Sequence, residues 1–477
     1  MKIEKLLENV TVTKVDRYCN VEVAGVEIDA RKPLEGKVFV CLVGERFDGH
    51  EFAEQAAEKG AVAIVAEHSV AASIPVFIVK NARRALAVMC GNFYGNPANK
   101  LNIVTVVGTN GKTSTTEILS QIFSYAGYKA ATVGTLGYKI GENRSEGELT
   151  TPDPMELHRH LAEMQEQGVQ YVFMEASAHA IHYDKLAGIK AKVSVLTNIT
   201  QDHLDFFKDM ERYADVKLSY FNHLNTALAV VNSDDPYALR LINHPTVPVI
   251  TYGVDNPADV FAINISDGEA GLRFTLNAFD CIFDVVTSLH GRFNVYNVMA
   301  ATATAMYLGV GSMTVKNALS QIVPVPGRYN VDYVHGVRVV VDYAHTPDGL
   351  ENLLKGVRKS SEGKLITVFG CGGNRDKLKR PLMGKIASEY SDHVIITEDN
   401  PRYEAQKDIA DEIFAGVVAD TMCERIEDRA EAIRHAFVLA SRGDTVVIAG
   451  KGHERYIEKN GVKIPYSDYD ILQKSKE

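Results

Sequence analysis

The stretch that decides the fold runs from Ile103 to Ser114 and reads IVTVVGTNGKTS. Its first five residues predict a buried strand, and the glycine-containing turn after them leads into a helix-like stretch. Glycines let backbone N–H groups curl around phosphate oxygens, and a helix N-terminus adds a partial positive charge. Lys112 would then reach the terminal phosphates, and the Thr113 hydroxyl would ligate Mg²⁺. Because Val106 stands where the common P-loop spacing has its first glycine, a glycine-rich turn with an exposed lysine is the competing interpretation.

Strand-like and helix-like segments alternate along the rest of the chain. This alternation is typical of parallel sheets covered by helices. We predict an α/β protein of three domains, residues 1–98, 99–326 and 327–477, with boundaries at the linker-like Asn96–Lys100 and at Pro324–Gly327. A helix is expected over 407–418. The expected strands are Val38–Leu42, Ala61–Val65, Ile103–Val107, Tyr171–Met174, Val193–Thr197, Ala227–Val231, Val337–Val341, Leu365–Phe369, His393–Thr397 and Thr445–Ala449.

The composition is that of an ordinary globular protein, with 46% hydrophobic and 23% charged residues among 477. A net charge of −10 gives no support to nucleic-acid binding. The six cysteines contain no C-x-x-C pair, so neither a disulfide framework nor a zinc site is indicated. The first residues lack an apolar signal core, and no long apolar run occurs. We therefore expect a cytoplasmic protein without a membrane span.

Polar residues follow two further predicted strands. Glu175 ends one of them, and the segment containing Asn198, Asp202 and His203 follows the other. Ligands of α/β sheets bind at the carboxyl ends of the strands, and Mg²⁺ prefers oxygen ligands. Glu175 is therefore a candidate metal ligand. A capping or salt-bridged glutamate and a structural histidine are the competing interpretations.

Eight motifs occur in the order found in the Mur ligases: GTNGKTS, MEASAHA, LTNITQDHLD, GRFNVYN, VDYAHTPDGL, FGCGGNRDKLKRP, TEDNPR and GKGHE. The chain resembles this family over nearly its whole length, and within it the branch that adds the third peptide residue to a UDP-linked muramyl peptide. The resemblance implies a uridine-nucleotide-binding N-terminal domain, a central P-loop ATPase-type domain with a parallel sheet and a Rossmann-like C-terminal domain. It also implies that ATP phosphorylates a substrate carboxylate and that an amine attacks the resulting acyl phosphate.

The resemblance carries roles to single positions. Lys112, Glu175, His203 and Lys217 match catalytic positions, and Thr113, Glu175, His203 and Lys217 match those around Mg²⁺. Lys217 matches a carbamylated lysine; a free ammonium would repel Mg²⁺, whereas a carbamate acts as a carboxylate ligand. Without the resemblance, Lys217 would be interpreted as a solvated helix lysine. The implied ATP-binding residues are Gly108, Thr109, Asn110, Gly111, Lys112, Thr113, Ser114, Asn294, Asn297, Arg328, Asp342 and His345.

Two more sets belong to the other substrates. The residues implied to bind a UDP-N-acetylmuramoyl dipeptide are Ala30, Glu45, Arg46, Phe47, Thr150, Thr151, Ser177, Tyr183 and Lys185. Asp399 to Arg402 resembles the version of the family that takes meso-diaminopimelate, because a guanidinium can hold the distal carboxylate that lysine lacks. The implied diaminopimelate-binding residues are Arg375, Asp399, Asn400, Pro401, Arg402, Gly450 and Glu454. We expect a monomer.

Several positions depart from the family pattern on the acceptor side. Ala30 replaces a serine, Tyr183 and Lys185 stand in place of Q-x-R, and Asn330 replaces a glutamate. Lysine keeps the charge of arginine but loses its planar fork. These departures leave three alternatives open: a paralogous ligase with another acceptor, an enzyme that adds lysine, and an inactive nucleotide-binding scaffold. The folate polyglutamate ligases share the ATPase motifs but not the uridine-type first domain.

Overall fold

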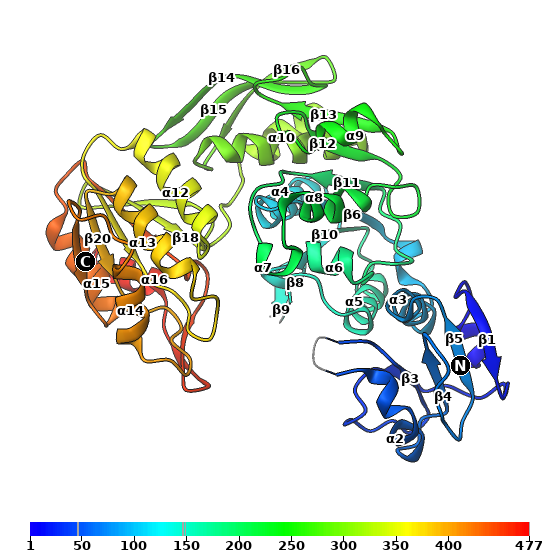
Figure 1. Cartoon of the computed structure of the whole chain (residues 1–477). Helices are drawn as coiled ribbons and strands as arrows, with labels where there is room; N and C mark the ends of the chain where they lie inside the picture. Colours follow the sequence, from blue (N-terminus) through cyan, green and yellow to red (C-terminus); the bar gives the residue numbers. More distant parts are fainter. Residues whose placement is uncertain (45–46, 146, 148, 477) are drawn as a thin grey trace. The chain divides into compact units, whose positions relative to one another are not determined.

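The computed structural model describes residues 1–44, 47–145, 147 and 149–476 (Figure 1). The chain forms two compact units. One contains Met1–Ile199, Leu204–Phe261 and Met299–Val315, and the other contains Thr200–His203, Ala262–Val298 and Lys316–Glu477. The division into three domains at 98 and 326 stays a prediction.

The first sheet has the strand order β1-β5-β4-β3-β2, parallel except for β1. Val38, Val40 and Phe39 of β3 are at most 1% exposed. Burial on both faces is expected of a parallel sheet, and it explains why the apolar runs at 38–42 and 61–65 correctly predicted strands. The elements here are α1 (Ile3–Leu6), β1 (Val12–Asp16), β2 (Gly25–Glu27), β3 (Lys37–Val40), η1 (Gly49–Phe52), α2 (Ala53–Glu58), β4 (Ala63–Ala66), β5 (Val76–Val79), α3 (Ala82–Phe93) and η2 (Pro97–Lys100).

An eleven-stranded sheet follows in the order β16-β15-β14-β13-β12-β11-β6-β10-β7-β8-β9. The four strands predicted in this region are confirmed as β6, β10, β11 and β12. The strands are β6 (Asn102–Val107), β7 (Ala130–Gly134), β8 (Gly137–Ile140), β9 (Asn143–Ser145), β10 (Tyr171–Ala176), β11 (Val193–Leu196), β12 (Ala229–Asn232), β13 (Val249–Gly253), β14 (Val260–Gly268), β15 (Gly271–Ala278) and β16 (Cys281–Thr287). The helices are α4 (Lys112–Tyr125), α5 (Pro154–Glu166), α6 (Ala178–His182), α7 (Leu204–Phe207), α8 (Met210–Ser219), α9 (Leu239–Asn243), α10 (Arg292–Tyr307) and α11 (Ser312–Leu319).

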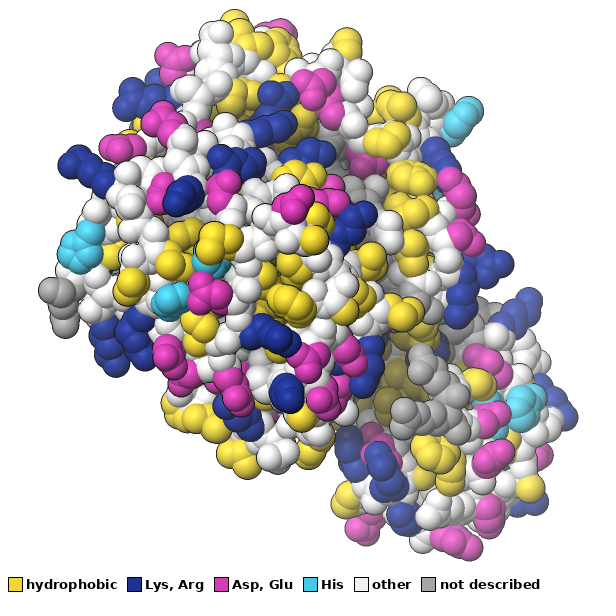
Figure 2. All heavy atoms as spheres, turned by 60° about the vertical axis from the view of Figure 1, so that its left-hand side comes forward, with side chains coloured by type: hydrophobic (Ala, Val, Ile, Leu, Met, Phe, Trp, Pro, Cys, Tyr) yellow, Lys and Arg dark blue, Asp and Glu magenta, His cyan; other side chains and the backbone are white. Residues whose placement is uncertain are grey.

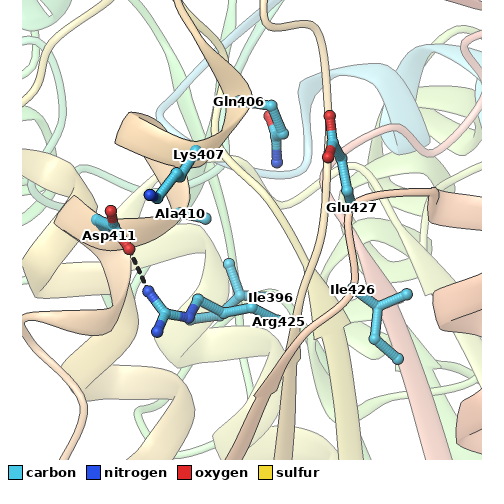
Figure 3. Close-up of a pocket in the computed structure, with 8 residues that line it drawn as sticks. All are labelled: Ile396, Gln406, Lys407, Ala410, Asp411, Arg425, Ile426 and Glu427. Atoms are coloured by element: carbon cyan, nitrogen blue, oxygen red, sulfur yellow. Dashed lines mark hydrogen bonds and ion pairs between the residues drawn. The ribbon is translucent and has the colours of Figure 1, made fainter.

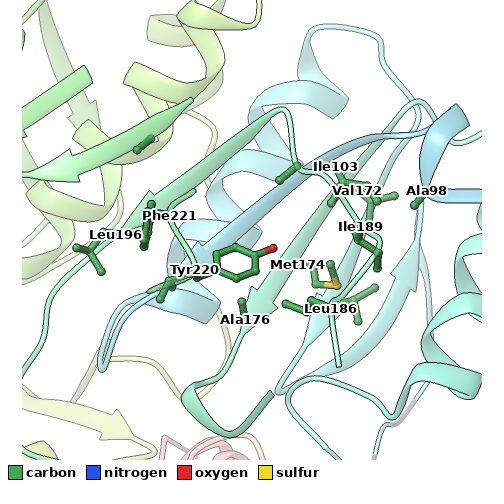
Figure 4. Packing of buried hydrophobic residues seen from close by; sticks show 14 of the residues in the cluster. Ala98, Ile103, Val172, Met174, Ala176, Leu186, Ile189, Leu196, Tyr220 and Phe221 are labelled. Carbon is green, nitrogen blue, oxygen red and sulfur yellow. The ribbon is translucent and has the colours of Figure 1, made fainter. Parts of the chain in front are cut away.

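The core of this sheet is built by strand periodicity. Val172, Met174 and Ala176 alternate along β10 and pack into one apolar cluster with Ile103 and Leu196 (Figure 4). All five are fully buried. Burying one such large apolar side chain stabilises a fold by roughly 1.5–3 kcal/mol, so the strand ends that carry polar residues stand on a rigid base.

The third sheet has the order β17-β18-β22-β19-β20-β21, and only β17 is antiparallel to its neighbour. The helix predicted at 407–418 is shorter in the structure and ends at Phe414. Two residues later Gly416 packs against Pro381, where a Cβ would lie 1.8 Å from the Pro381 carbonyl oxygen. The elements are β17 (Asn330–Val334), β18 (Val337–Asp342), α12 (Pro347–Ser360), β19 (Leu365–Phe369), α13 (Lys379–Tyr390), β20 (His393–Ile396), α14 (Gln406–Phe414), β21 (Met422–Arg425), α15 (Arg429–Leu439), β22 (Thr445–Ala449), β23 (Tyr456–Lys459), β24 (Val462–Pro465) and α16 (Asp468–Lys474).

The surface is mixed in charge. On the face drawn in Figure 2, lysine and arginine side chains are interspersed with aspartate and glutamate rather than gathered into one basic field. Within the described ranges, no helix is both long and apolar enough to cross a bilayer.

Candidate active site

The turn between β6 and α4 is held in place by residues that follow β11. The N–H groups of Thr109 and Asn110 donate to the backbone oxygen and the side-chain oxygen of Asn198, at 2.8 and 2.9 Å. A Cβ at Gly108 would lie 1.8 Å from the Thr197 hydroxyl, so only glycine fits there. Gly111 has φ +82° directly before the helix. The predicted strand, glycine turn and helix are therefore present, with the turn fixed from a neighbouring strand end.

Lys112 lies against this turn. Its Nζ donates to the carbonyl oxygens of Gly108 and Thr109 at 2.9 and 2.7 Å. Thr113 is buried and Ser114 half-buried in the first turn of α4. The helix N-terminus and the lysine ammonium place positive charge at one point, which suits a phosphate group.

Glu175 lies at the carboxyl end of β10, paired in register with Val106 of β6. Its side chain is 1% exposed. Its two oxygens accept hydrogen bonds from the N–H and the hydroxyl of Thr135 at 2.8 and 3.1 Å. A Cβ at Gly134 would lie 2.1 Å from Oε1, so this glycine makes the close approach possible. Each carboxylate oxygen keeps acceptor capacity for another ligand.

Lys217 lies near the end of α8 and is fully buried. Its Nζ donates to the Thr109 hydroxyl at 2.9 Å and lies 4.1 Å from the centre of the Tyr213 ring. The same Thr109 hydroxyl is 3.2 Å from the Tyr213 hydroxyl. The interpretation of Lys217 as a solvated helix lysine is wrong, because its side chain points inward to the glycine turn between β6 and α4.

A second set of polar side chains lies around the carboxyl end of β10. The Thr151 hydroxyl donates to the Glu175 carbonyl oxygen at 2.9 Å and accepts from the Ser177 N–H at 3.1 Å. Thr150 is 3.2 Å from the Thr135 hydroxyl. The three predicted peptide-binding residues Thr150, Thr151 and Ser177 therefore lie beside the predicted metal ligand.

The residues that differ from the family pattern on the side of the acceptor substrate contact neighbouring groups. Lys185 Nζ pairs with Asp153 at 2.7 Å, and the Arg83 guanidinium lies 4.2 Å from the centre of the Tyr183 ring. Ala30 is buried, with its carbonyl accepting from Lys59.

In the neighbouring turn, hydrogen bonds from Arg31 hold the pKa of Asp29 down at about 2. Phe47 is 71% exposed. The predicted uridine contacts Glu45 and Arg46 lie outside the described residues.

The remaining predicted ATP and metal residues belong to the second unit. His203 adopts φ +53° and has a half-exposed side chain beside Asp202, with Nε2 3.4 Å from the carboxylate. Asn294 and Asn297 are buried at the start of α10, joined by a 2.8 Å hydrogen bond between their amides.

Asp342 ends β18, and its carboxylate accepts from the N–H groups of Tyr329 and Ala344, both at 2.7 Å. Burial raises the pKa of Asp342, whereas the Arg328 charge and these two hydrogen bonds oppose the rise. Arg328 stacks 4.8 Å from the centre of the Tyr343 ring, and His345 Nδ1 donates to the Tyr343 carbonyl oxygen, 2.8 Å away. Since a carbonyl can only accept, His345 Nδ1 carries the proton.

The predicted amino-acid residues gather around Asn400. Its amide donates to Glu454 at 2.9 Å, and its oxygen accepts from the fully buried Lys451 at 3.1 Å. Lys451 also pairs with Glu454 at 2.9 Å and lies 3.9 Å from Asp399. A Cβ at Gly450 would lie 2.7 Å from the Asp399 carboxylate, which explains the glycine.

A buried arginine supports the loop that carries Arg375. Arg380 is fully buried and binds both oxygens of Glu404, the Glu412 carboxylate at 2.7 Å and the Gly372 carbonyl at 3.2 Å. These hydrogen bonds hold the pKa of Glu404 down at about 2. Arg375 itself is exposed.

Comparisons with known proteins cover the whole chain. The profiles "Mur ligase family, catalytic domain", "Mur ligase middle domain" and "Mur ligase, glutamate ligase domain" match residues 22–94, 106–305 and 327–452. The UDP-N-acetylmuramoyl-L-alanyl-D-glutamate–2,6-diaminopimelate ligase of Geobacillus thermodenitrificans is 43% identical over 96% of this chain and 95% of its own. The chain belongs to the Mur ligase family.

Further relatives and solved structures are similar to this chain in sequence or fold. The ligase of the same name from Aquifex aeolicus is 39% identical over 94% of this chain and 93% of its own. A solved structure bearing that ligase name superposes with a TM-score of 0.72 at 31% identity, covering 100% of this chain and 98% of its own. MurF from Acinetobacter baumannii shares the fold, with a TM-score of 0.64 at 21% identity over 94% of this chain and 95% of its own.

This Mur ligase also has a pocket that the sequence did not predict. It has a volume of about 250 Å³ and lies between α14 and the ends of β20 and β21 (Figure 3). Lys407 and Arg425 line it together with Asp411 and Glu427, and Arg425 is paired with Asp411. Cations and anions balance there, so it offers no charge preference for a phosphate or a carboxylate.

Sequence reasoning missed the residues that support the predicted ones. Thr135 holds Glu175, and Lys451 joins Asn400 to Glu454. Asn198 was noted only as a polar residue after a strand, and its role in holding the glycine turn was missed. Asn198 and Lys451 stand inside motifs quoted from the sequence, so they could have been singled out. Thr135 lies in no such motif, and only the pairing of β7 with β10 brings it to Glu175.

Proposed function

We propose that this Mur ligase joins meso-diaminopimelate to the D-glutamate carboxylate of UDP-N-acetylmuramoyl-L-alanyl-D-glutamate, with ATP as co-substrate. One observation carries the proposal: relatives named for this reaction are 39–43% identical along nearly the entire chain. The gathering of Asp399, Asn400 and Glu454 after the carboxyl ends of β20 and β22 supports it. We also expect a cytoplasmic monomer, since ATP and a UDP-linked precursor are intracellular substrates.

The reaction needs two bond exchanges. A substrate carboxylate oxygen attacks the γ-phosphorus of ATP, the bond to the bridging oxygen breaks, and ADP leaves. The amine then attacks the acyl carbon, loses a proton, and expels phosphate as the carbon–oxygen bond breaks. The N–H groups of the Gly108–Ser114 turn other than those of Thr109 and Asn110, which donate to Asn198, would bind the phosphates together with the Lys112 ammonium. They would stabilise the charge that develops on the transferred group.

A magnesium ion fits the oxygen-rich end of β10. The Thr113 hydroxyl, the Glu175 carboxylate and His203 would hold it, together with Lys217 as a carbamate. The fit is chemical: Glu175 keeps acceptor capacity on both oxygens, and Lys217, whose carbamate would add further oxygen ligands, is buried beside the Thr109 hydroxyl. Bound Mg²⁺ would neutralise phosphate charge during transfer.

The remaining residues position the two organic substrates. Thr150, Thr151, Ser177, Tyr183 and Lys185 would contact the muramyl peptide. Lys185 supplies a single ammonium where other members present a guanidinium fork, so we expect one hydrogen bond to the D-glutamate carboxylate rather than a bidentate grip. At the other end, Arg402 would bind the distal carboxylate of diaminopimelate and Glu454 its distal ammonium.

Phosphate release measured with purified protein tests the proposal. We expect release that requires ATP, Mg²⁺, the UDP-muramyl dipeptide and meso-diaminopimelate together, with formation of the tripeptide product by mass spectrometry. Release with lysine in place of diaminopimelate would reassign the added amino acid. Release with a different acceptor would favour a paralogous ligase, and no release with any acceptor would favour an inactive scaffold.

A further inference from the structure

The β23–β24 hairpin lies beside the proposed diaminopimelate site, and nothing in the family motifs assigns its residues a role. We infer that Glu458, on β23, is the positioning residue that aims Arg402 at the distal carboxylate of the amino acid. The inference rests on the proposed function, in which Arg402 binds that carboxylate. It adds a residue on which the choice between diaminopimelate and lysine depends.

The first support is the contact between the two side chains. Arg402 Nε donates to Glu458 Oε2 at 3.0 Å, and Arg402 Nη1 donates to the Gly373 carbonyl oxygen at 2.9 Å. Both side chains are largely buried, at 20% and 24% exposure. Ion pairs in such surroundings are screened less than surface pairs.

The second support is the set of donors that remains. A guanidinium has five N–H donors in a rigid fork. Glu458 occupies the Nε edge and Gly373 takes one Nη1 hydrogen, and the guanidinium makes no further hydrogen bond within the described part of the chain. The donors left over are on Nη1 and Nη2, the outer edge that holds a carboxylate bidentately. Glu458 thus determines which edge faces the ligand.

The third support is the backbone. Arg402 has φ +54°, a left-handed conformation that is costly for a residue with a side chain. Two hydrogen bonds to the hairpin hold it there: Arg402 N–H donates to the Glu458 carbonyl at 3.0 Å, and Asn460 N–H donates to the Arg402 carbonyl at 2.8 Å. Strained backbone persists where the surroundings fix it, and here the same hairpin fixes both backbone and side chain.

The hairpin also reaches the other end of the amino-acid site. The Glu458 N–H donates to the Asn400 side-chain oxygen at 2.9 Å, and the Asn400 amide donates to Glu454. The Glu458 side chain therefore contacts Arg402, proposed for the distal carboxylate, and its backbone contacts Asn400, which is hydrogen-bonded to Glu454, proposed for the distal ammonium. Replacing the Glu458 side chain removes its contact with Arg402 and leaves the backbone contact with Asn400 in place.

Steady-state kinetics on Glu458→Ala tests the inference. We expect the KM for meso-diaminopimelate to rise by about 10- to 100-fold, the range for loss of a hydrogen bond to a charged group. The KM values for ATP and for the UDP-muramyl dipeptide should stay within about twofold. Glu458→Gln keeps the size and can still accept from Nε without the charge, so it should recover part of the loss and guards against misfolding of the alanine variant.

Lys463→Ala is the matched control. Lys463 is the cross-strand partner of Glu458 in the hairpin and is exposed, so its removal changes the hairpin without touching Arg402. We expect it to leave all three KM values unchanged. In the Arg402→Ala background, Glu458→Ala should add no further loss, because its target is already gone.

The outcomes separate the inference from the function it rests on. If wild-type protein turns over diaminopimelate and Arg402→Ala impairs this, but Glu458→Ala does not, the inference is overturned and the proposed function stands. Equal losses in Glu458→Ala and Lys463→Ala, or a parallel rise in the KM for ATP, would also overturn it, since they would show a merely structural role. Absence of diaminopimelate turnover in the wild type would remove both.

Discussion

Different kinds of interaction hold the glycine turn at Gly108–Ser114 and the proposed amino-acid site around Asn400. The turn is held chiefly by neutral contacts, namely the hydrogen bonds to Asn198 and the close packing of Gly108, and the ammonium groups of Lys112 and Lys217 donate to its oxygens. The amino-acid site is fixed by ion pairs, Arg402 with Glu458 and Lys451 with Glu454. A phosphate is recognised by backbone N–H groups whatever it is attached to, whereas one amino acid is distinguished from another by its charges. Changes in the turn should therefore abolish the reaction, and changes in the ion pairs should alter its selectivity.

The largest effect is expected at the turn. Lys112→Ala should lower kcat by on the order of a thousandfold or more, because it removes positive charge from the transferred phosphoryl group. Binding of the UDP-muramyl dipeptide, measured by calorimetry, should persist. Thr115→Ser, a change on the same helix that keeps the hydroxyl, serves as the control and should retain turnover. Near-normal turnover of Lys112→Ala would remove Lys112 from its role.

Arg402→Ala tests the amino-acid site. When lysine binds, Glu458 still pairs with the Nε edge of Arg402, but the outer edge of the guanidinium lacks its carboxylate. Loss of hydrogen bonds to a charged group costs about 1.5–3 kcal/mol, or some one to two powers of ten. Wild-type protein should therefore prefer meso-diaminopimelate to lysine by such a factor in kcat/KM, and Arg402→Ala should lose most of the preference while KM for ATP is unchanged. A wild type that uses both amino acids equally would contradict the specificity, though not the ligase chemistry.

Lys217 tests whether the turn also depends on a modified residue. Lys217→Ala should keep about one to ten per cent of the activity, as for loss of a group that supports a metal site. Short carboxylates such as formate should restore part of it by supplying an anion. Intact-mass measurement at raised bicarbonate should detect an added carboxyl group on the wild type and not on the variant. Full activity of Lys217→Ala would contradict the role.

The two regions also differ in how far the sequence predicted them. Strand, turn and helix at 103–114 are consecutive, so local pattern was sufficient, and the ten predicted strands match strands of the structure. Pairings such as Thr135 with Glu175 or Glu458 with Arg402 depend on sheet order and on a hairpin, which local pattern does not reveal. The β14–β16 ribbon was missed because one-sided strands lack continuous apolar runs. Which residues bind each substrate stays a prediction, carried by resemblance rather than by local pattern.

The smallest expected effect concerns the stability of the ion-pair region. Arg380 hydrogen bonds hold the pKa of Glu404 at about 2, below its ordinary value of 4.5. The fold therefore prefers the ionised carboxylate, and this contribution is fully present above about pH 4.5 and is lost as the pH falls towards 2. After a reduction for solvent screening, Glu404→Gln should lower local stability by about 2 kcal/mol at pH 7.

Hydrogen exchange of peptides from α13 and α14 measures that difference, because these helices carry Arg380 and Glu412 beside the network. The wild type and Glu404→Gln should differ at pH 7 and converge as the pH approaches 2. Glu389→Gln, which removes an exposed carboxylate 3.6 Å from Lys385, is the control and should change protection little at either pH. A difference that is independent of pH would mean that Glu404 acts by shape rather than by charge. The amino-acid site would then be less dependent on ion pairs than its contacts indicate.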